Sequence, residues 1–298
     1  MYIAITITAA PDSEDALLDA ASALQRDLNG ALQFQWLAAG EAIDLILSED
    51  GEDDVIEKIK GIAAAAIGDM PLDWCAQPAE GRRKRMLIAD MDGTIIRQES
   101  LDELADIKGI KPEIAALTER AMRGDLDFET ALLQRIRLLA DVTPADLEHV
   151  LRECITLEPG AQTLVHTMKA SGAHTVLVSG GFTFFTRAVA ARAGFDTDRA
   201  NGFLWVDGHL SGVAEPILGR EGKLATLMDE AAAHGLKPSD VIAVGDGAND
   251  LAMLKGAGLG VAYRAKPVVA AAACAQINHT NLTALLYFQG YTRDSFVS

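Results

Sequence analysis

The chain has 298 residues, of which 49% are hydrophobic, and this composition supports one large folded domain or two unequal ones. Its formal net charge of −17 argues against nucleic acid and an anionic membrane surface as partners, because both require a basic counter-surface. The three cysteines lack metal-ligand spacing, and no apolar run is long enough to span a membrane. We therefore expect a cytoplasmic protein without a signal peptide or membrane anchor.

Residues 1–80 predict a small α+β module. Tyr2 to Ala9 alternates apolar residues with threonine, a pattern that is typical of a strand. The following runs predict, in order, a helix, two strands, a helix and a strand: 13–28, 31–38, 42–49, 53–68 and 72–76. The resulting order is βαββαβ. A basic stretch, AEGRRKR at 79–85, follows the module, and we interpret it as a solvated linker.

Residues 84–298 predict an α/β domain. RMLIAD (85–90), HTVLVS (174–179) and DVIAVGD (240–246) are short apolar runs of the kind found in parallel sheets that are covered on both faces. Helical runs that end at glycines lie between them. This alternation predicts a doubly wound, Rossmann-like parallel sheet.

A helical insertion interrupts that alternation at about residues 101–157. Four successive segments there are helical in pattern, and no strand-like run separates them. Long segments inserted after a strand of an α/β domain tend to be functional. We predict a helical cap over the strand ends.

Two aspartates, Asp90 and Asp92, follow the first strand of this domain in the motif DMDGT. Ligands of open α/β sheets bind at the carboxyl ends of the strands, so both carboxylates can face that crevice. A single aspartate there could equally cap a helix or form a turn. Two acids with an apolar residue between them and Gly-Thr behind them favour a functional site.

A second acidic loop, GDGAND, follows the strand-like run DVIAV and contains Asp246, Asn249 and Asp250. Their oxygen atoms suit Mg²⁺, which prefers a few carboxylates together with water and phosphate oxygens. By itself this loop could be an ordinary Gly-Asp turn. Two acidic strand-end loops in one domain favour a metal site.

Ser179-Gly180 and Lys223 are candidates for binding phosphate. The Ser-Gly-Gly run follows a predicted strand, where its hydroxyl and backbone N–H groups can approach an anion closely. Lys223 lies near a predicted helix start, where the helix dipole favours anions rather than cations. Taken singly, the first is more often a turn and the second a surface lysine.

One reaction uses all four elements. A carboxylate attacks phosphorus and forms an acyl phosphate, which water then hydrolyses. A second acid protonates the departing alkoxide and later activates the water. Mg²⁺ and a lysine neutralise charge that would otherwise keep an anionic nucleophile away from an anionic phosphate. We therefore expect a phosphoric monoester hydrolase that acts on a small-molecule phosphomonoester.

The order DMDGT, SGG, lysine and GDGAND resembles the haloacid dehalogenase (HAD) superfamily of phosphatases, and in detail its phosphoserine phosphatases. The resemblance extends from about Lys84 to the end of the chain. It implies that Asp90 is the nucleophile and Asp92 the general acid and base. One departure is Gly93, where many members of the family have serine, and it leaves the expected reaction unchanged.

The resemblance also assigns the metal and phosphate ligands. The Asp90 carboxylate, the Asp92 carbonyl and Asp246 would hold Mg²⁺, and Asp250 would lie beside these ligands without binding the metal. The residues assigned to the phosphate site are Ser179, Gly180, Lys223 and Asn249.

The same resemblance implies an amino-acid substrate. Glu99, at the entrance to the cap, would pair with an ammonium group, and Arg135 would bind a carboxylate. Met122 and Phe128 would line the pocket. The implied function is hydrolysis of O-phospho-L-serine to L-serine and phosphate, the last step of serine biosynthesis. Each of the two charged residues, taken alone, is an ordinary surface charge.

Two other functions remain open from the sequence. A phosphatase or phosphotransferase acting on phosphohomoserine or phosphothreonine would use the same chemistry. A non-catalytic amino-acid sensor is a more distant alternative. Clustered carboxylates argue against the sensor, because a scaffold has no need of like charges that repel one another.

The N-terminal module resembles ACT-type regulatory domains by its pattern alone. That resemblance implies serine feedback, and because such modules often pair, it also implies a homodimer. His166, His174 and His209 share no metal-ligand spacing, and we expect structural roles for them.

Overall fold

The computed structural model describes residues 1–298 except 12, 29–31, 50–53 and 123–124, and in this described part ten strands form one sheet while two more form a hairpin. The strands are β1 (Tyr2–Ala9), β2 (Gln33–Ala38), β3 (Ala42–Ser48), β4 (Leu72–Pro78), β5 (Met86–Asp90), β6 (His174–Phe182), β7 (Thr197–Asn201), β8 (Phe203–Val206), β9 (His209–Val213), β10 (Val241–Gly245), β11 (Leu259–Tyr263) and β12 (Ala275–Ile277).

The α-helices lie between these strands along the chain. They are α1 (Glu14–Asp27), α2 (Val55–Ile67), α3 (Ser100–Ile107), α4 (Lys111–Met122), α5 (Phe128–Leu138), α6 (Pro144–Glu153), α7 (Ala161–Ala170), α8 (Thr183–Ala193), α9 (Arg220–Ala233), α10 (Leu251–Gly256), α11 (Pro267–Ala270) and α12 (Ala284–Phe288). Three short 3₁₀ turns complete the described elements: η1 (Pro238–Asp240), η2 (Ala248–Asp250) and η3 (Arg293–Ser295).

The N-terminal elements follow the predicted order β1–α1–β2–β3–α2–β4. β1 pairs antiparallel with both β3 and β4, and β2 adds to the outer side of β3. Ile3, Ile5 and Ile7 of β1 pack in one core with Leu17 and Leu24 of α1. The start of the second predicted helix, at residue 53, lies outside the described residues.

The other six strands of the large sheet are parallel, in the order β7-β6-β5-β10-β11-β12. Alternate residues of β5 enter two different cores: Met86 and Ile88 pack on the side of α9 and α10, whereas Leu87 and Ala89 pack on the other side. Both faces are therefore covered, which confirms the predicted doubly wound α/β fold. In the sheet, β6 lies on one side of β5 and β10 lies on the other side. The strand order therefore reverses at β5, and these central strands form the topological switch point.

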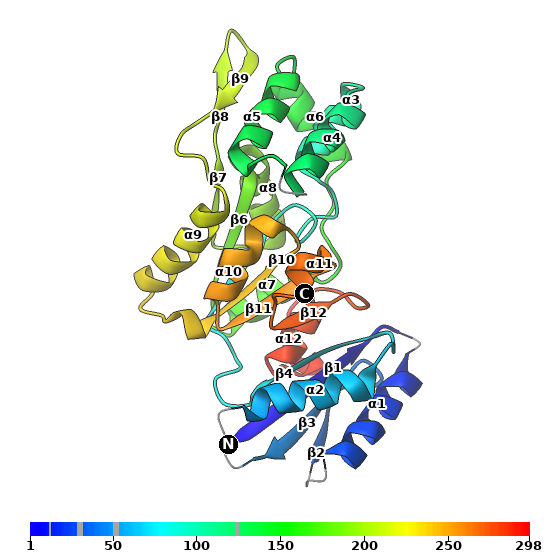
Figure 1. Ribbon diagram of the computed structural model, residues 1–298. Helices are drawn as coiled ribbons and strands as arrows, with labels where there is room; N and C mark the ends of the chain where they lie inside the picture. Colours follow the sequence, from blue (N-terminus) through cyan, green and yellow to red (C-terminus); the bar gives the residue numbers. More distant parts are fainter. Residues whose placement is uncertain (12, 29–31, 50–53, 123–124) are drawn as a thin grey trace.

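Helices α3 to α6 form the predicted cap, which lies between β5 and α7 in the chain. Asp127 begins α5 by accepting a hydrogen bond from the Thr130 backbone N–H at 2.9 Å, and Thr143 and Asp146 form a capping box at the start of α6. In Figure 1 the cap lies at one end of the molecule, and the four N-terminal strands lie at the other. Among the described residues, no helix is both long enough and apolar enough to cross a membrane.

The two parts of the sheet meet where β12 pairs antiparallel with β4, at Gln276 and Trp74. The predicted solvated linker is wrong for Arg82 and Lys84. Arg82 Nη2 lies 2.6 Å from Oδ2 of the buried Asp44, and Lys84 Nζ donates to the backbone oxygens of Gly81 and Ser239. The basic run is thus part of the junction, because its cations find carboxylate and carbonyl partners there.

Candidate active site

The two acidic motifs lie at the switch point of the sheet. Asp90 is the last residue of β5, and Asp246 directly follows β10, the neighbouring parallel strand. A cavity of about 610 Å³ lies between these strand ends and the cap. The predicted site residues that line it are Asp90, Asp92, Glu99, Phe128, Arg135, Ser179, Gly180, Asp246 and Asn249.

Lys223 lies beneath the cavity, fully buried in the first turn of α9. Its Nζ donates to Oδ1 of Asp90 at 2.6 Å and to Oδ1 of Asp250 at 2.5 Å. Burial alone would lower the pKa of Lys223, but Asp250 and Asp90 outweigh burial and raise this pKa. Lys223 is therefore a permanent buried cation beside the predicted nucleophile.

Asp250 organises the loop that follows β10. Its Oδ2 accepts hydrogen bonds from the backbone N–H groups of Asp246 (3.2 Å) and Gly247 (3.0 Å), while Lys223 occupies Oδ1. Both oxygens are thus engaged by the protein. This arrangement favours the predicted placement of Asp250 beside the metal ligands rather than among them.

Carboxylates crowd the base of the cavity, and one oxygen from each of Asp90, Asp246 and Asp250 lies within 4.8 Å of the other two. Burial raises the pKa of Asp90 well above its usual range, and Asp250 raises it further. Burial and Asp250 likewise raise the pKa of Asp246 to about 6. Because Lys223 alone cannot balance these charges, the donor set fits a further divalent cation with a preference for oxygen ligands.

Asp92 is oriented by two hydrogen bonds. Its Oδ1 accepts from the Ser100 backbone N–H at 2.8 Å, and its Oδ2 accepts from the Ser179 hydroxyl at 3.3 Å. Burial raises the pKa of Asp92, and the hydrogen bond from the Ser100 backbone N–H opposes that rise. A fixed carboxyl group with a raised pKa suits a proton donor.

The Ser-Gly-Gly run, predicted to be a turn, forms part of the last residues of β6 and lies directly under the cap. A side chain at Gly180 would place its Cβ 2.8 Å from Cζ of Phe128, the first residue of α5, and 3.7 Å from Nδ2 of Asn249. The Gly181 backbone N–H donates to the Ser179 hydroxyl at 2.8 Å. Glycine at this position leaves room for the Phe128 ring, which a larger residue would have to displace.

An acidic and a basic side chain, Glu99 and Arg135, line the cavity on its cap side. Burial raises the pKa of Glu99 to about 8, with further contributions from Asp92 and Asp246, while Arg135 lowers it. The Nε of Arg135 is buried and has no hydrogen-bond partner. A buried guanidinium N–H without a partner, on an arginine that lines a cavity, indicates a place for an anionic ligand.

Met122 is the last residue of α4, and its side chain lies outside the described part of the structure. Several lining residues were missed by the sequence: Ser100, Thr118, Arg220 and Lys266. Ser100 carried a signal, since it directly follows Glu99 at a predicted helix start. Thr118 lies on the cap helix α4, Arg220 begins α9 and Lys266 directly precedes α11, so only the tertiary packing brings them to the cavity.

Taken together, the switch-point carboxylates, the buried lysine and the helical cap define a capped α/β hydrolase with an aspartate centre. The chain belongs to the haloacid dehalogenase-like hydrolase family, whose sequence model matches residues 87–255.

Named relatives agree with this membership. A phosphoserine phosphatase of Streptomyces coelicolor is 43% identical over 78% of this chain, and the match spans 56% of that protein's length. A HAD family hydrolase of Salmonella enterica has a TM-score of 0.82 and 32% identity, covering 96% of this chain and 98% of its own. A solved phospho-aspartyl intermediate analogue of phosphoserine phosphatase has a TM-score of 0.65 and 34% identity, covering 69% of this chain and 99% of its own.

Proposed function

We propose that the chain is a phosphoserine phosphatase, which hydrolyses O-phospho-L-serine to L-serine and phosphate. The observation that carries this proposal is the division of charge around one cavity. Its base holds Asp90, Asp92 and Lys223, which suit phosphoryl transfer, and its cap side holds Glu99 and Arg135, which suit an amino acid. The phosphoserine phosphatases among its relatives support the same substrate.

The first step assigned to this site is attack on phosphorus by Asp90. Lys223 holds one oxygen of that carboxylate at 2.6 Å, so the other remains available to form the new P–O bond. Asp92 gives its proton to the departing serine oxygen as the ester P–O bond breaks. The result is an aspartyl-phosphate on Asp90 and free serine.

The second step returns the enzyme to its starting state. Asp92, now a carboxylate, takes a proton from a water molecule, and the resulting hydroxide attacks the phosphorus of the aspartyl-phosphate. The Asp90–phosphate bond breaks, which releases inorganic phosphate and restores the Asp90 carboxylate. The Ser179 hydroxyl, the backbone around Gly180 and the Asn249 amide hold the phosphate oxygens during both steps.

Mg²⁺ is the cation that we assign to the crowded carboxylates. Asp90, Asp246 and the backbone carbonyl of Asp92 would hold it, and all three supply the oxygen ligands that it prefers. When bound, it supplies positive charge for the phosphate oxygens and for the carboxylates themselves.

A substrate panel tests both chemistry and substrate. Phosphate release is measured from L-phosphoserine, D-phosphoserine, phosphothreonine, phosphohomoserine and p-nitrophenyl phosphate, with Mg²⁺ and with EDTA. We expect turnover that depends on Mg²⁺ and is fastest with L-phosphoserine. An Asp90→Asn variant should release no phosphate from any of them, since an amide is a far poorer nucleophile.

Each other outcome has a clear meaning. Faster turnover of phosphothreonine or phosphohomoserine would reassign the substrate but keep the mechanism. Even activity over the whole panel would remove Glu99 and Arg135 from substrate recognition. Activity of Asp90→Asn equal to that of the wild type would remove Asp90 as the nucleophile.

We assign the enzyme to the cytoplasm and to the last step of serine biosynthesis. Cys75, Cys154 and Cys274 are all free thiols, which supports a reducing compartment.

Residues 1–80 are proposed to be an ACT-like regulatory module. β2 is an outer strand of the sheet, and its Phe34 and Trp36 are 45% and 36% exposed. This edge supports a homodimer in which β2 strands pair, and light scattering of a Trp36→Glu variant tests it.

A further inference from the structure

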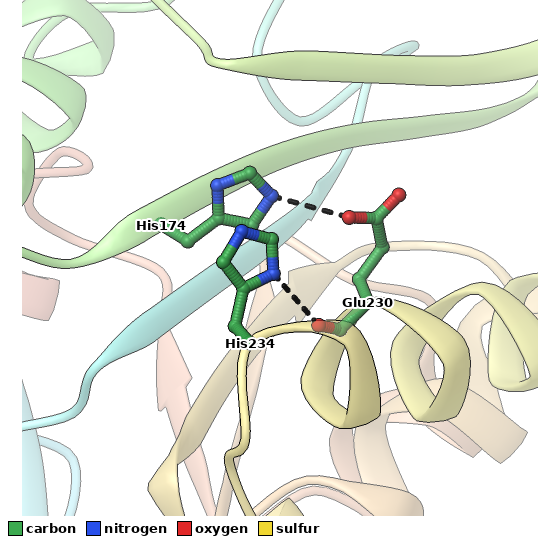
Figure 2. Close-up of side chains that lie close together, drawn as sticks. All are labelled: His174, Glu230 and His234. Atoms are coloured by element: carbon green, nitrogen blue, oxygen red, sulfur yellow. Dashed lines mark hydrogen bonds and ion pairs between the residues drawn. The ribbon is translucent and has the colours of Figure 1, made fainter.

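A second cluster of side chains that can bind a metal lies away from the cavity. It involves β6 and α9, which also carry residues of the candidate active site, but it lies at the other end of each element. β6 begins at His174 and carries Ser179, while α9 begins beside Lys223 and ends at Ala233. His174, Glu230 and His234 come together there, with Glu230 and His234 one helical turn apart (Figure 2). His174 and Glu230 are 56 residues apart in the chain, so the spacing of the histidines did not reveal this cluster.

The donor atoms of the three side chains are close together. Nε2 of His174 lies 3.2 Å from Oε2 of Glu230, and one donor atom from each of the three residues lies within 4.8 Å of the others. The His174 and His234 rings stack with their centroids 3.8 Å apart, as Figure 2 shows. Two ligands on one tetrahedral zinc ion, at bond lengths near 2.0–2.1 Å, are about 3.3 Å apart. The His174–Glu230 pair already matches that separation.

Outer contacts orient both imidazoles. Nδ1 of His234 lies 2.9 Å from the Glu230 backbone oxygen, and because a carbonyl can only accept, that nitrogen carries the hydrogen and Nε2 the lone pair. Nδ1 of His174 faces Oδ2 of Asp196 at 3.6 Å. Carbonyl or carboxylate partners on the second ring nitrogen are the usual support of metal-binding histidines.

The two carboxylate oxygens of Glu230 have different partners. Arg199 Nη2 lies 2.9 Å from Oε1, which leaves Oε2 directed at His174. Glu230 and His174 are largely buried, whereas His234 is exposed. Two ligands are therefore held in place by packing. The lone pair of an imidazole nitrogen lies in the ring plane, so the exposed His234 ring has to rotate out of its stack on His174 before both histidines bind one ion.

We propose that His174, Glu230 and His234 form a binding site for one zinc-type transition-metal ion. Two imidazoles and one carboxylate are a donor set that suits Zn²⁺ and is poorly matched to Mg²⁺, which prefers oxygen ligands. A bound ion replaces the hydrogen bond between His174 and Glu230, so their existing separation is kept. It would link the start of β6 to the end of α9, at the opposite end of the parallel strands from the catalytic carboxylates.

The test uses the full chain saturated with Mg²⁺, so that the active-site carboxylates are occupied, and titrates it with Zn²⁺ by calorimetry and thermal unfolding. We expect one Zn²⁺ per chain and a rise in Tm of roughly 5 °C at a hundredfold excess over Kd. His234→Ala removes an exposed ligand without disturbing the core, and it should weaken zinc binding on the order of 100-fold. His209→Ala, which removes another exposed histidine, is the matched control and should bind as the wild type does.

Two results would overturn the proposal. One is equal zinc affinity in His234→Ala and the wild type. The other is an anomalous zinc signal, in crystals grown with Zn²⁺, that lies only at Asp90 and Asp246. A signal between His174, Glu230 and His234 supports the site directly, whatever happens to turnover.

Discussion

Arg135 and Glu99 line the same cavity, and each shifts the pKa of the other. Arg135 lowers the pKa of Glu99, although burial and nearby carboxylates leave that pKa near 8. The ammonium group of a zwitterionic amino acid would pair with Glu99, and its carboxylate would pair with Arg135. Substrate binding would then satisfy the unpaired Nε of Arg135 and favour the ionised form of Glu99.

Replacing Arg135 tests whether its guanidinium binds the substrate carboxylate. Arg135→Ala should raise KM for L-phosphoserine on the order of 100-fold, because the substrate carboxylate would lose a charge-assisted partner. KM for p-nitrophenyl phosphate, which has no carboxylate, should change less than about threefold. Steady-state kinetics on both substrates measures the difference.

Arg137 provides the control, since it lies on the same helix with its side chain exposed. Arg137→Ala should leave KM for both substrates unchanged. If Arg135→Ala impaired both substrates equally, the arginine would serve the phosphate or the fold instead of the carboxylate.

At this scale the sequence predicted the chemistry of the cavity better than its surroundings. Asp90, Asp92 and Asp246 could be predicted because they follow apolar strands directly. Lys223 could be proposed but not paired, since its contact with Asp90 spans 133 residues. The proximity of His174 to Glu230, 56 residues further along the chain, was hidden for the same reason.

A buried side chain of β4 binds the loop that follows β12, where the N-terminal strands join the parallel sheet. Asp73 of β4 is 2% exposed and accepts hydrogen bonds from the loop that follows β12. The donors are the backbone N–H groups of Asn278, His279 and Thr280 and the Thr280 hydroxyl, at distances of 2.6–3.2 Å. A buried carboxylate with this many donors stabilises the loop strongly.

Asp73→Ala should lower the free energy of unfolding by about 3 kcal/mol, because four loop donors would be left buried without their charged acceptor. Thermal unfolding should show a fall in Tm of roughly 8 °C. Asp69→Ala, at an exposed position shortly before β4, should change Tm by less than about 2 °C. Equal Tm values for the Asp73 and Asp69 variants would show that the junction does not depend on this carboxylate.

Local pattern predicted most of the N-terminal strands and the parallel strands β5, β6 and β10, whose boundaries agree with the predictions to within a few residues. β7, β11 and β12 were not predicted, although β11 (LGVAY) is a short apolar run like β5, β6 and β10. β7 (TDRAN) is polar, and β12 has only three residues, so neither carries a strand pattern of its own. Their pairing is decided by neighbouring strands that are distant in the sequence.

Across the whole molecule, the excess of carboxylates in the cavity links stability to pH and to metal. The pKa of Glu99 rises from 4.5 to about 8, and that of Asp246 rises from 3.8 to about 6. Between the ordinary and the raised values, the folded protein holds protons that the unfolded chain has released. The free energy of unfolding of the metal-free protein therefore falls as the pH rises through this window.

We expect Tm of the EDTA-treated protein to fall between about pH 5 and pH 8, with a smaller fall in saturating Mg²⁺. The cation balances the carboxylates once they ionise, so the rise in Tm caused by Mg²⁺ should grow with pH. Thermal unfolding over this range, with Mg²⁺ and with EDTA, measures it. A Tm of the metal-free protein that rises with pH would contradict the raised pKa values.

The pairing of β4 with β12 also determines when the large sheet can be completed during synthesis. β4 is complete when residue 78 has been made, but its partner strand ends at residue 277, and Asp73 and Asn278 are 205 residues apart. One edge of the N-terminal strands thus stays unpaired until residues 275–277 have left the ribosome. An early unpaired edge favours pairing with other chains. Closure of the large sheet is a late, long-range event, and a nascent chain that stalls before β12 carries an open strand edge.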